Sequence, residues 1–221
     1  MNDFFDSFLT GMKMTQGQRL LNYTQSIGYH FDRLLDERPG ISLVDACDLT
    51  HTMTWVCHTS EAAWGFFRID LIPLKPLDDQ LAYSCTRHLK AISMREDWRG
   101  AGFWKMAMEI ILNAAEKSGI MLHGISRPFV MKWPTITNAK EMKWFLNNEE
   151  KFFSYLPSNK EQKRQSKRLL EKYREVGCCG FKYPAGNGFS SSYKRNNFGF
   201  AYLSSEAPAT VQEAMGPFLS C

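Results

Sequence analysis

Residues 94–105 read MREDWRGAGFWK, and this stretch decides how the middle of the chain is expected to fold. Gly100, Ala101 and Gly102 separate an apolar run from an amphipathic run. Small residues at such a place predict a tight turn that leads into a helix. The first amides of a helix have no partners within it, and the helix dipole adds partial positive charge. The turn is therefore a candidate anion-binding site, with basic side chains on both sides of it.

The run behind this turn, residues 103–118, is the clearest helix in the sequence. Its apolar residues recur at helical spacing and its polar residues lie on the opposite side; the apolar set is Phe103, Met106, Ile110, Ile111 and Ala114. Gly119 is the expected C-terminal stop. The apolar run 120–126 then predicts a buried strand. Together, residues 88–126 predict a strand, turn, helix, strand unit whose two strands pair in parallel.

The same kind of pattern predicts the remaining elements. They are a helix at 16–37, a hairpin of strands at 52–58 and 63–72, extended chain at 80–94, a helix behind a capping box of Asn138 and Glu141, a helix at about 161–176 and a last strand in FGFAYLS, 198–204. No internal repeat and no Gly/Ser-rich or Pro-rich linker divides the sequence. We therefore expect a single domain, 1–221, of mixed α/β class with a central sheet.

Composition limits the class of protein. The chain has 221 residues, is 44% hydrophobic and carries a net charge of +4, which fits an ordinary globular protein. The first residues lack the pattern of a signal peptide, and no run is long and apolar enough for a membrane span, so we expect a cytoplasmic protein that does not bind a membrane. The six cysteines form no C-x-x-C pair and are expected to be reduced thiols, and the histidines show no metal-binding spacing.

A local excess of positive charge lies in residues 160–174, KEQKRQSKRLLEKYR. One interpretation is the solvated face of a helix, and the other is a patch for the phosphates of nucleic acid or of a nucleotide cofactor. The run SSSYKRNNFGF, 190–200, adds Lys194 and Arg195 beside aromatic residues. Basic residues interleaved with aromatics can hold phosphates and an unstacked base, so nucleic acid is a candidate partner.

Residues 89–126 resemble the acyl-CoA-binding segment of the GCN5-related N-acetyltransferase (GNAT) superfamily. The family pattern is Arg or Gln, two residues, Gly, one residue, then Gly or Ala, and here it runs from Arg99 to Trp104. The resemblance implies a mixed central sheet flanked by helices, with a β-α-β cofactor-binding core at about 88–126. It also implies acetyl-CoA as cofactor, bound by Met94, Arg99, Gly100, Ala101, Gly102, Phe103, Trp104 and Lys105.

The segment LLEKYREVGCCGF, 169–181, resembles a late helix of the same family. The resemblance implies that Tyr173 is the acid that protonates the leaving thiolate, although the spacing to Gly180 is longer than usual. The other interpretation of Tyr173 is a core tyrosine on an apolar helix face. Candidate bases are Glu61, Asp70, His88 and Glu96, while His123 and Ser126 are expected near the substrate cleft.

The most direct functional hypothesis is an enzyme, a GNAT-type N-acyltransferase that moves an acetyl group from acetyl-CoA to an unidentified amine. Trp104 stands where the family pattern has Gly or Ala, so its ring either blocks the cofactor or turns toward the core. If it blocks, two alternatives follow. One is a DNA adenine-modifying enzyme similar to the phage Mom proteins, and the other is a non-catalytic binding or structural protein that keeps the fold. Homodimers are common in the resembled family.

Overall fold

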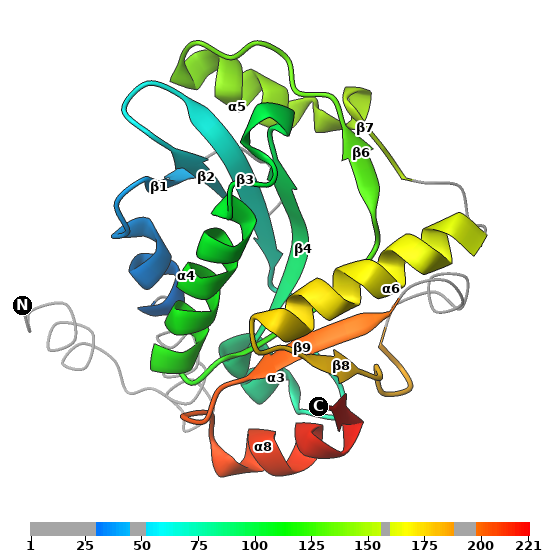
Figure 1. Cartoon of the computed structure of the whole chain (residues 1–221). Coiled ribbons are helices and arrows are strands. Elements are labelled where there is room, and N and C mark those ends of the chain that lie inside the picture. The colour runs from blue at the N-terminus through cyan, green and yellow to red at the C-terminus, as the bar shows by residue number, and fades with distance from the viewer. Residues whose placement is uncertain (1–29, 45–51, 156–159, 188–197) are drawn as a thin grey trace, which may run out of the picture.

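The structure is a computed structural model that describes residues 30–44, 52–155, 160–187 and 198–221 (Figure 1). In this described part, eight strands form one mixed sheet and two more form a small separate sheet. The strands of the main sheet are β1 (Ile41–Val44), β2 (Thr52–His58), β3 (Ala63–Asp70), β4 (Thr86–Met94), β5 (Met121–Ile125), β8 (Cys179–Phe181), β9 (Gly199–Leu203) and β10 (Leu219–Ser220). Their order is β1-β2-β3-β4-β5-β9-β8-β10.

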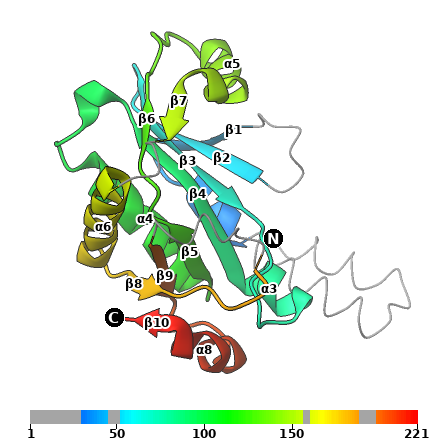
Figure 2. The same ribbon diagram turned by 90° about the vertical axis from the view of Figure 1, so that its right-hand side faces the viewer.

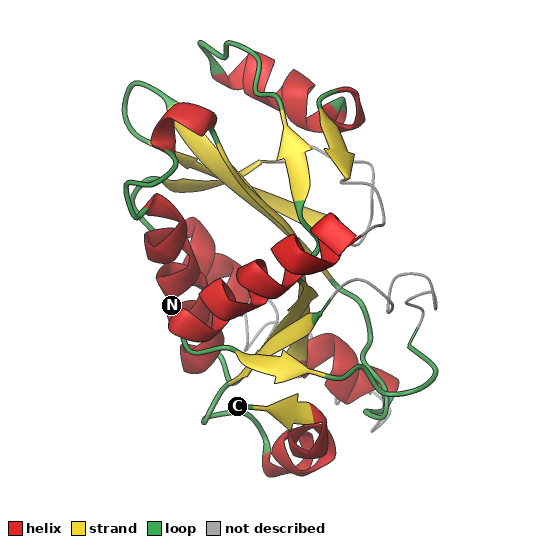
Figure 3. Cartoon of the chain, turned by 45° about the vertical axis from the view of Figure 1, so that its right-hand side comes forward, coloured by secondary structure: helices red, strands yellow, loops and turns green. Residues whose placement is uncertain are grey.

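Helices cover both faces of the main sheet (Figures 1 and 2). One face packs against residues 30–36, α4 (Phe103–Lys117) and α6 (Lys160–Glu175). The other face is covered at one end by α5 (Ala139–Asn147) with the small sheet of β6 (Phe129–Met131) and β7 (Phe153–Tyr155), and at the other end by α3 (Asp79–Cys85) and α8 (Ala209–Met215). The expected mixed α/β class, with a central sheet flanked by helices, is confirmed (Figure 3).

Alternation along the strands explains the two covered faces. In the β2–β3 hairpin, Trp55 and Phe67 are paired across the ladder and stack with 5.3 Å between ring centroids, on the α4 side. Their neighbours Val56 and Phe66 point to the α5 side. Successive side chains of a strand face opposite sides, so both layers of helices find apolar partners. The predicted hairpin is confirmed.

The β4–α4–β5 unit also forms as predicted. β4 and β5 pair in parallel from Thr86 opposite Met121 to Leu89 opposite Gly124. α4 begins after Gly102, whose φ is 83°, and is followed by Gly119 with φ 63°. Positive φ is costly for residues with a Cβ, which is why glycine occupies both positions.

A β-bulge lies where β4 leaves β5. In the ladder with β3, Ala91 pairs with Arg68 and Leu89 pairs with Ile69, so Lys90 has no opposite residue. The pairing of β4 with β5 ends at Leu89, one residue before the bulge. A bulge bends its strand and increases the local twist. The bend therefore carries the second half of β4 away from β5 and opens the sheet.

Two expectations about the order of elements need correction. The first part of the expected extended run 80–94 is the helix α3, because the Asp78 side chain accepts a hydrogen bond from the Leu81 amide (3.0 Å) and caps it. The expected last strand forms as β9, but α8 and the short strand β10 follow it. Of the predicted helix 16–37, residues 30–36 are helical and 16–29 lie outside the described residues.

The two later helices follow their sequence patterns. The Asn138 side chain accepts a hydrogen bond from the Glu141 amide (2.9 Å), as a capping box requires. The Glu141 carboxylate accepts from the amide of Thr137 (2.7 Å), one residue earlier than in the usual box. α6 spans almost the predicted residues and buries Leu170 and Tyr173.

The expectation that all six cysteines are reduced thiols is wrong for two of them. Cys179 and Cys221 form a disulfide, with 4.5 Å between their Cα atoms. In the antiparallel register of β8 and β10, Ser220 lies opposite Gly180, so the next pair brings these cysteines face to face. Cys57, Cys85 and Cys178 are buried free thiols. Within the described residues, no helix is long and apolar enough to cross a membrane.

Candidate functional site

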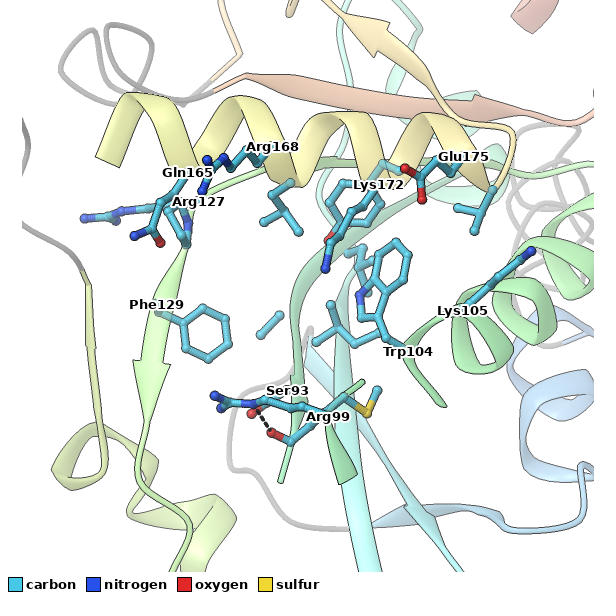
Figure 4. Close-up of a pocket in the computed structure, with 18 of the residues that line it drawn as sticks. Ser93, Arg99, Trp104, Lys105, Arg127, Phe129, Gln165, Arg168, Lys172 and Glu175 are labelled. Atoms are coloured by element: carbon cyan, nitrogen blue, oxygen red, sulfur yellow. Dashed lines mark hydrogen bonds between the residues drawn. The ribbon is translucent and has the colours of Figure 1, made fainter. Parts of the chain in front are cut away.

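A cleft of about 780 Å³ opens where β4 and β5 separate. Its walls are the second half of β4, the glycine turn with the start of α4, Ile125 at the end of β5 with residues 127–129 beyond it, and one face of α6 (Figure 4). Concave sites of this size, lined by apolar and a few polar groups, are typical of ligand-binding sites. The bulge in β4 therefore lies at the point where the sheet opens into a cleft that a ligand could use.

The second half of β4 presents backbone groups to the cleft. The Arg95 amide donates to the Trp64 carbonyl (2.9 Å), so the next pair, Met94 opposite Gly65, is a pair without mutual hydrogen bonds. The amide and carbonyl of Met94 consequently face away from β3, and this carbonyl accepts a hydrogen bond from Arg99 Nε (3.2 Å). By the same alternation, the Ile92 amide faces the cleft side.

The glycine turn brings a helix N-terminus to the same cleft. Gly100 and Gly102 have φ of 85° and 83°, and a Cβ added to either would meet no atom within 4 Å. Gly102 is the N-cap of α4 and provides no capping side chain. The first amides of α4, which have no acceptor within the helix, are thus left accessible to an anion. Backbone approach is unhindered at both glycines.

Trp104 extends from the first turn of α4 into the cleft (Figure 4). Its ring packs edge-on against Tyr173 of α6, with 5.4 Å between ring centroids. Tyr173 in turn stacks on Phe200 of β9, at 3.6 Å and 11°. The ring is half-buried and lies against the core, so it is accommodated by packing while it still lines the cleft.

Tyr173 is almost fully buried, with 4% of its surface exposed, and it lines the inner part of the cleft. Burial, with a smaller contribution from Cys178, raises the pKa of its phenol above the usual value. A phenol with a raised pKa keeps its proton and is a weaker acid. Proton transfer from it to a thiolate is correspondingly less favourable than from an ordinary tyrosine.

The cleft is strongly basic. Among the described residues that line it, six are basic and one is acidic: Lys90, Arg99, Lys105, Arg127, Arg168 and Lys172 against Glu175. Lys90 lies 3.7 Å from the Asp70 carboxylate and Lys105 lies 3.8 Å from that of Glu109. Clefts lined by one sign of charge concentrate ligands of the opposite sign. The arrangement therefore favours an anionic ligand.

The structure brings most of the sequence-predicted site residues together. The ones that line the cleft are Met94, Arg99, Gly100, Gly102, Trp104, Lys105 and Tyr173. Ala101 is exposed outside the lining, and Phe103 turns to the core, where its ring lies 5.1 Å from Trp64 and 4.8 Å from Trp98.

The candidate bases do not line the cleft. Glu61 and Glu96 are exposed elsewhere, in the β2–β3 turn and before the glycine turn. Asp70 and His88 are neighbours on the other face of the sheet, with 3.8 Å between His88 Nδ1 and Asp70 Oδ2. Burial raises the pKa of Asp70, but hydrogen bonds from His88 and Thr52 and the charge of Lys90 outweigh it and hold that pKa below its usual value.

The two polar residues expected near the cleft have structural contacts instead. His123 is fully buried and its Nδ1 lies 2.9 Å from the Tyr183 hydroxyl. Burial, with a smaller contribution from His88, lowers its pKa well below the usual value, so the ring stays neutral. The Ser126 hydroxyl donates to the Phe198 carbonyl (2.7 Å) and lies 3.0 Å from the Ser166 hydroxyl. It thereby ties the end of β5 to α6.

Sequence patterns missed several residues of the cleft. Arg127 and Phe129 follow β5 in a segment without periodicity, and Ser93 lies in an ordinary strand. Only their position in the sequence could have indicated these residues, because they lie close to the ends of two strands that were expected to pair in parallel. Lys194 and Arg195, predicted as further phosphate contacts, lie outside the described residues. Over the described ranges, no group of three or more His, Cys, Asp or Glu side chains could hold a metal ion.

Of the comparisons with known proteins, only the comparison with solved structures finds similar proteins. No family model matches the chain, and no curated protein sequence matches it. Similar folds include the GNAT domain of S. lividans PAT (11% identity, 71% of this chain, 63% of that chain, TM-score 0.37). A Bacillus subtilis acetyltransferase in complex with CoA is also similar (10% identity, 74% of this chain, 97% of that chain, TM-score 0.40). So is Tetrahymena GCN5 (9% identity, 88% of this chain, 95% of that chain, TM-score 0.41). The chain thus spans less than two thirds of the S. lividans chain.

Proposed function

We propose that this protein transfers an acetyl group from acetyl-CoA to an amine. The observation that carries the proposal is the meeting of two sets of backbone donors in one cleft. The unpaired edge of β4 presents the Ile92 and Met94 amides, and the turn of Gly100 and Gly102 presents the first amides of α4. A thioester carbonyl needs the first set and a pyrophosphate needs the second.

The residues of the chain would divide the work as follows. Acetyl-CoA supplies a thioester, in which the amine nitrogen replaces the sulfur on the acetyl carbon. An amide of β4 donates to the carbonyl oxygen and stabilises the negative charge that develops there. Arg99 and Lys105 stand beside the glycine turn, where they add positive charge for the phosphates. The departing thiolate takes a proton from Tyr173, whose raised pKa makes it a weak acid, or from water. The nitrogen releases one proton to water as the amide forms, and a proton from water restores the phenol, so the products are the acetylated amine and the free thiol of coenzyme A.

A second candidate function is favoured by one observation, the position of Trp104. Its indole lines the cleft beside Tyr173, at the place where the GNAT pattern has glycine or alanine. An indole there reduces the room for an extended cofactor. This favours a protein that uses another donor, as in DNA adenine modification of the Mom type, or a non-catalytic protein that keeps the fold.

Calorimetric titration with acetyl-CoA tests the proposal. Binding in the micromolar range, about −8 kcal/mol, is expected for the wild-type chain. Gly102→Glu should abolish it, because a carboxylate at the turn repels phosphate and fills the approach. Gly186→Glu is the matched control, since Gly186 has nearly the same φ (84°), has room for a Cβ and lies outside the cleft lining. A wild-type chain that is folded and does not bind acetyl-CoA would overturn the proposal and favour the second candidate.

A further inference from the structure

We propose that the cleft and the adjoining exposed side of α6 bind single-stranded nucleic acid. As a statement about the acceptor of the acetyl group, this proposal rests on the proposed function. The binding of nucleic acid can be tested independently of that function. Three observations lead to it: the charge of the cleft, the length over which that charge continues along α6, and the aromatic rings at the cleft.

The first observation concerns the cations of the cleft. Of the six basic residues that line it, Arg99, Arg168 and Lys172 form no ion pair within the described residues. Arg168 and Lys172 are one helical turn apart on α6 and face the cleft together (Figure 4). Guanidinium and ammonium groups without a carboxylate partner are available for phosphate oxygens.

The second observation concerns the outer side of α6. Arg164 and Arg174 are paired with Glu161 (2.8 Å) and Glu171 (3.2 Å) of the same helix. Three exposed lysines of α6 form no ion pair within the part of the chain that the structure describes: Lys160, Lys163 and Lys167.

The lysines and the cleft cations lie on different sides of α6, since Lys163 and Lys172 are nine residues, or two and a half turns, apart. Together, from Lys160 to Lys172, these basic residues extend over about 18 Å of the helix, at 1.5 Å per residue. Phosphates of a stacked strand follow each other at about 3.4 Å. A strand that leaves the cleft and crosses the exposed side of α6 would therefore meet cations at several successive phosphates, more than one small nucleotide carries.

The third observation concerns the aromatic rings. Phe129 projects into the cleft from β6, and Trp104 projects from α4 (Figure 4). At the same side, the Arg127 guanidinium lies 3.4 Å from the centre of the Tyr155 ring. Aromatic and guanidinium planes are the surfaces on which unpaired bases stack.

The aromatic rings also indicate whether the nucleic acid is single-stranded or double-stranded. Bases in a duplex are stacked on one another and reach a concave pocket only after they are flipped out, which costs a few kcal/mol. A single strand can place a base beside Phe129 without that cost. The combination of cations along α6 and rings inside a cleft therefore favours a single strand.

Fluorescence anisotropy with a labelled, mixed-sequence single-stranded DNA of about 15 nucleotides tests the proposal, in about 50 and 200 mM salt. We expect micromolar binding at the lower salt and a marked loss at the higher. The double variants Arg168→Ala/Lys172→Ala and Lys163→Ala/Lys167→Ala should each weaken binding about 5- to 10-fold and reduce the slope of log K against log salt by about 1.4. Phe129→Ala should weaken binding and leave that slope unchanged.

Lys117→Ala/Lys182→Ala is the matched control, because it removes the same charge from exposed residues outside the cleft and outside α6. It should change affinity by less than about 2-fold. Absence of binding at the lower salt overturns the proposal, as does an equal loss in the control. A duplex of the same sequence that binds as tightly as the single strand overturns the choice of strand. Titration with acetyl-CoA on the same preparation separates this result from the proposed activity, since either ligand can fail while the other binds.

Discussion

The indole of Trp104 contacts the phenol ring of Tyr173 edge-on, with 5.4 Å between ring centroids, and this contact joins the first turn of α4 to α6. One of these residues occupies the last position of the glycine motif, and the other is the candidate acid. The two parts of the proposed site are therefore in direct contact. A substitution of either ring should change the packing of the other.

Trp104→Gly should open the start of α4 and increase acetyl-CoA affinity about 10-fold, because an indole no longer lies in the cleft. The same change removes the contact with Tyr173 and should lower the free energy of unfolding by about 1 to 3 kcal/mol, less than for a fully buried tryptophan. Calorimetry and thermal melting measure the two effects. Trp144→Gly, at a 53% exposed position on α5, is the control and should leave acetyl-CoA affinity unchanged. Weaker acetyl-CoA binding in Trp104→Gly would mean that the indole is part of the cofactor site.

Tyr173→Phe should lower turnover about 10- to 100-fold if the phenol gives its proton to the thiolate. Because burial raises the pKa of Tyr173, the phenol stays protonated throughout the range in which such an enzyme is assayed. The pH–rate profile should therefore show no basic limb from Tyr173 below about pH 10, in the wild type or in the variant. Full turnover in Tyr173→Phe would leave only the packing role, and a basic limb that disappears in the variant would contradict the raised pKa.

Ionisation of Asp32 should lower the free energy of unfolding as pH rises from about 4 to 6. Burial raises the pKa of this carboxyl to about 6, against the opposing effect of the Arg87 charge. A raised folded-state pKa means that the folded protein holds the proton more tightly than the unfolded chain, so stability is lost as pH rises through this window. The loss should reach at most about 3 kcal/mol. Urea unfolding at several pH values measures it.

Asp32→Asn should remove this pH dependence, since the amide does not ionise. Asp79→Asn, an exposed change in the first turn of α3, should retain the wild-type behaviour. If Asp32→Asn and the wild type lose stability in parallel between pH 4 and 6, the carboxyl of Asp32 is not the group responsible.

Cys221→Ser should destabilise the fold without affecting acetyl-CoA binding. The disulfide with Cys179 closes a loop of 42 residues, for which chain entropy predicts about 4 kcal/mol at most. The bond joins β8 to β10, and neither strand lines the cleft. Thermal melting of the wild type in reducing agent should reproduce the variant, while the variant itself should not respond to reductant. Identical melting of the oxidised wild type and the variant would exclude a stabilising disulfide.

Regular patterns in the sequence were sufficient to predict the centre of the molecule. The apolar positions of α4 repeat at helical spacing over four turns, and the strands of the β2–β3 hairpin are rich in β-branched and aromatic residues on either side of a polar turn. α3, in contrast, has seven residues, and its start depends on the single hydrogen bond from Leu81 to Asp78. Elements of two or three residues, such as β6, β7 and β10, have no period to detect.

The site was predictable to the extent that it is local. Arg99, Gly102 and Trp104 belong to one continuous motif and were identified as a unit. Arg127 and Phe129 belong to the site only because β4 bends away from β5, and the bend follows from one unpaired residue in a ladder. The disulfide depends in the same way on a pairing between strands 40 residues apart, at Gly180 and Ser220. Contacts between distant segments leave no local trace in the sequence.

The unmatched Lys90 also acts as a one-residue phase shift in β4. Leu89 lies before it and Ile92 and Met94 lie after it, yet all three face the core on the α4 side, which strict alternation from Leu89 would not allow. Deletion of Lys90 would place Ile92 two residues after Leu89, so a regular strand would keep all three apolar side chains on the α4 side but would lose the bulge. Substitution of Lys90 changes only a side chain and leaves the bulge in place. The extra residue of β4 is thus needed for the bend that separates β4 from β5, and not for the apolar pattern of the strand.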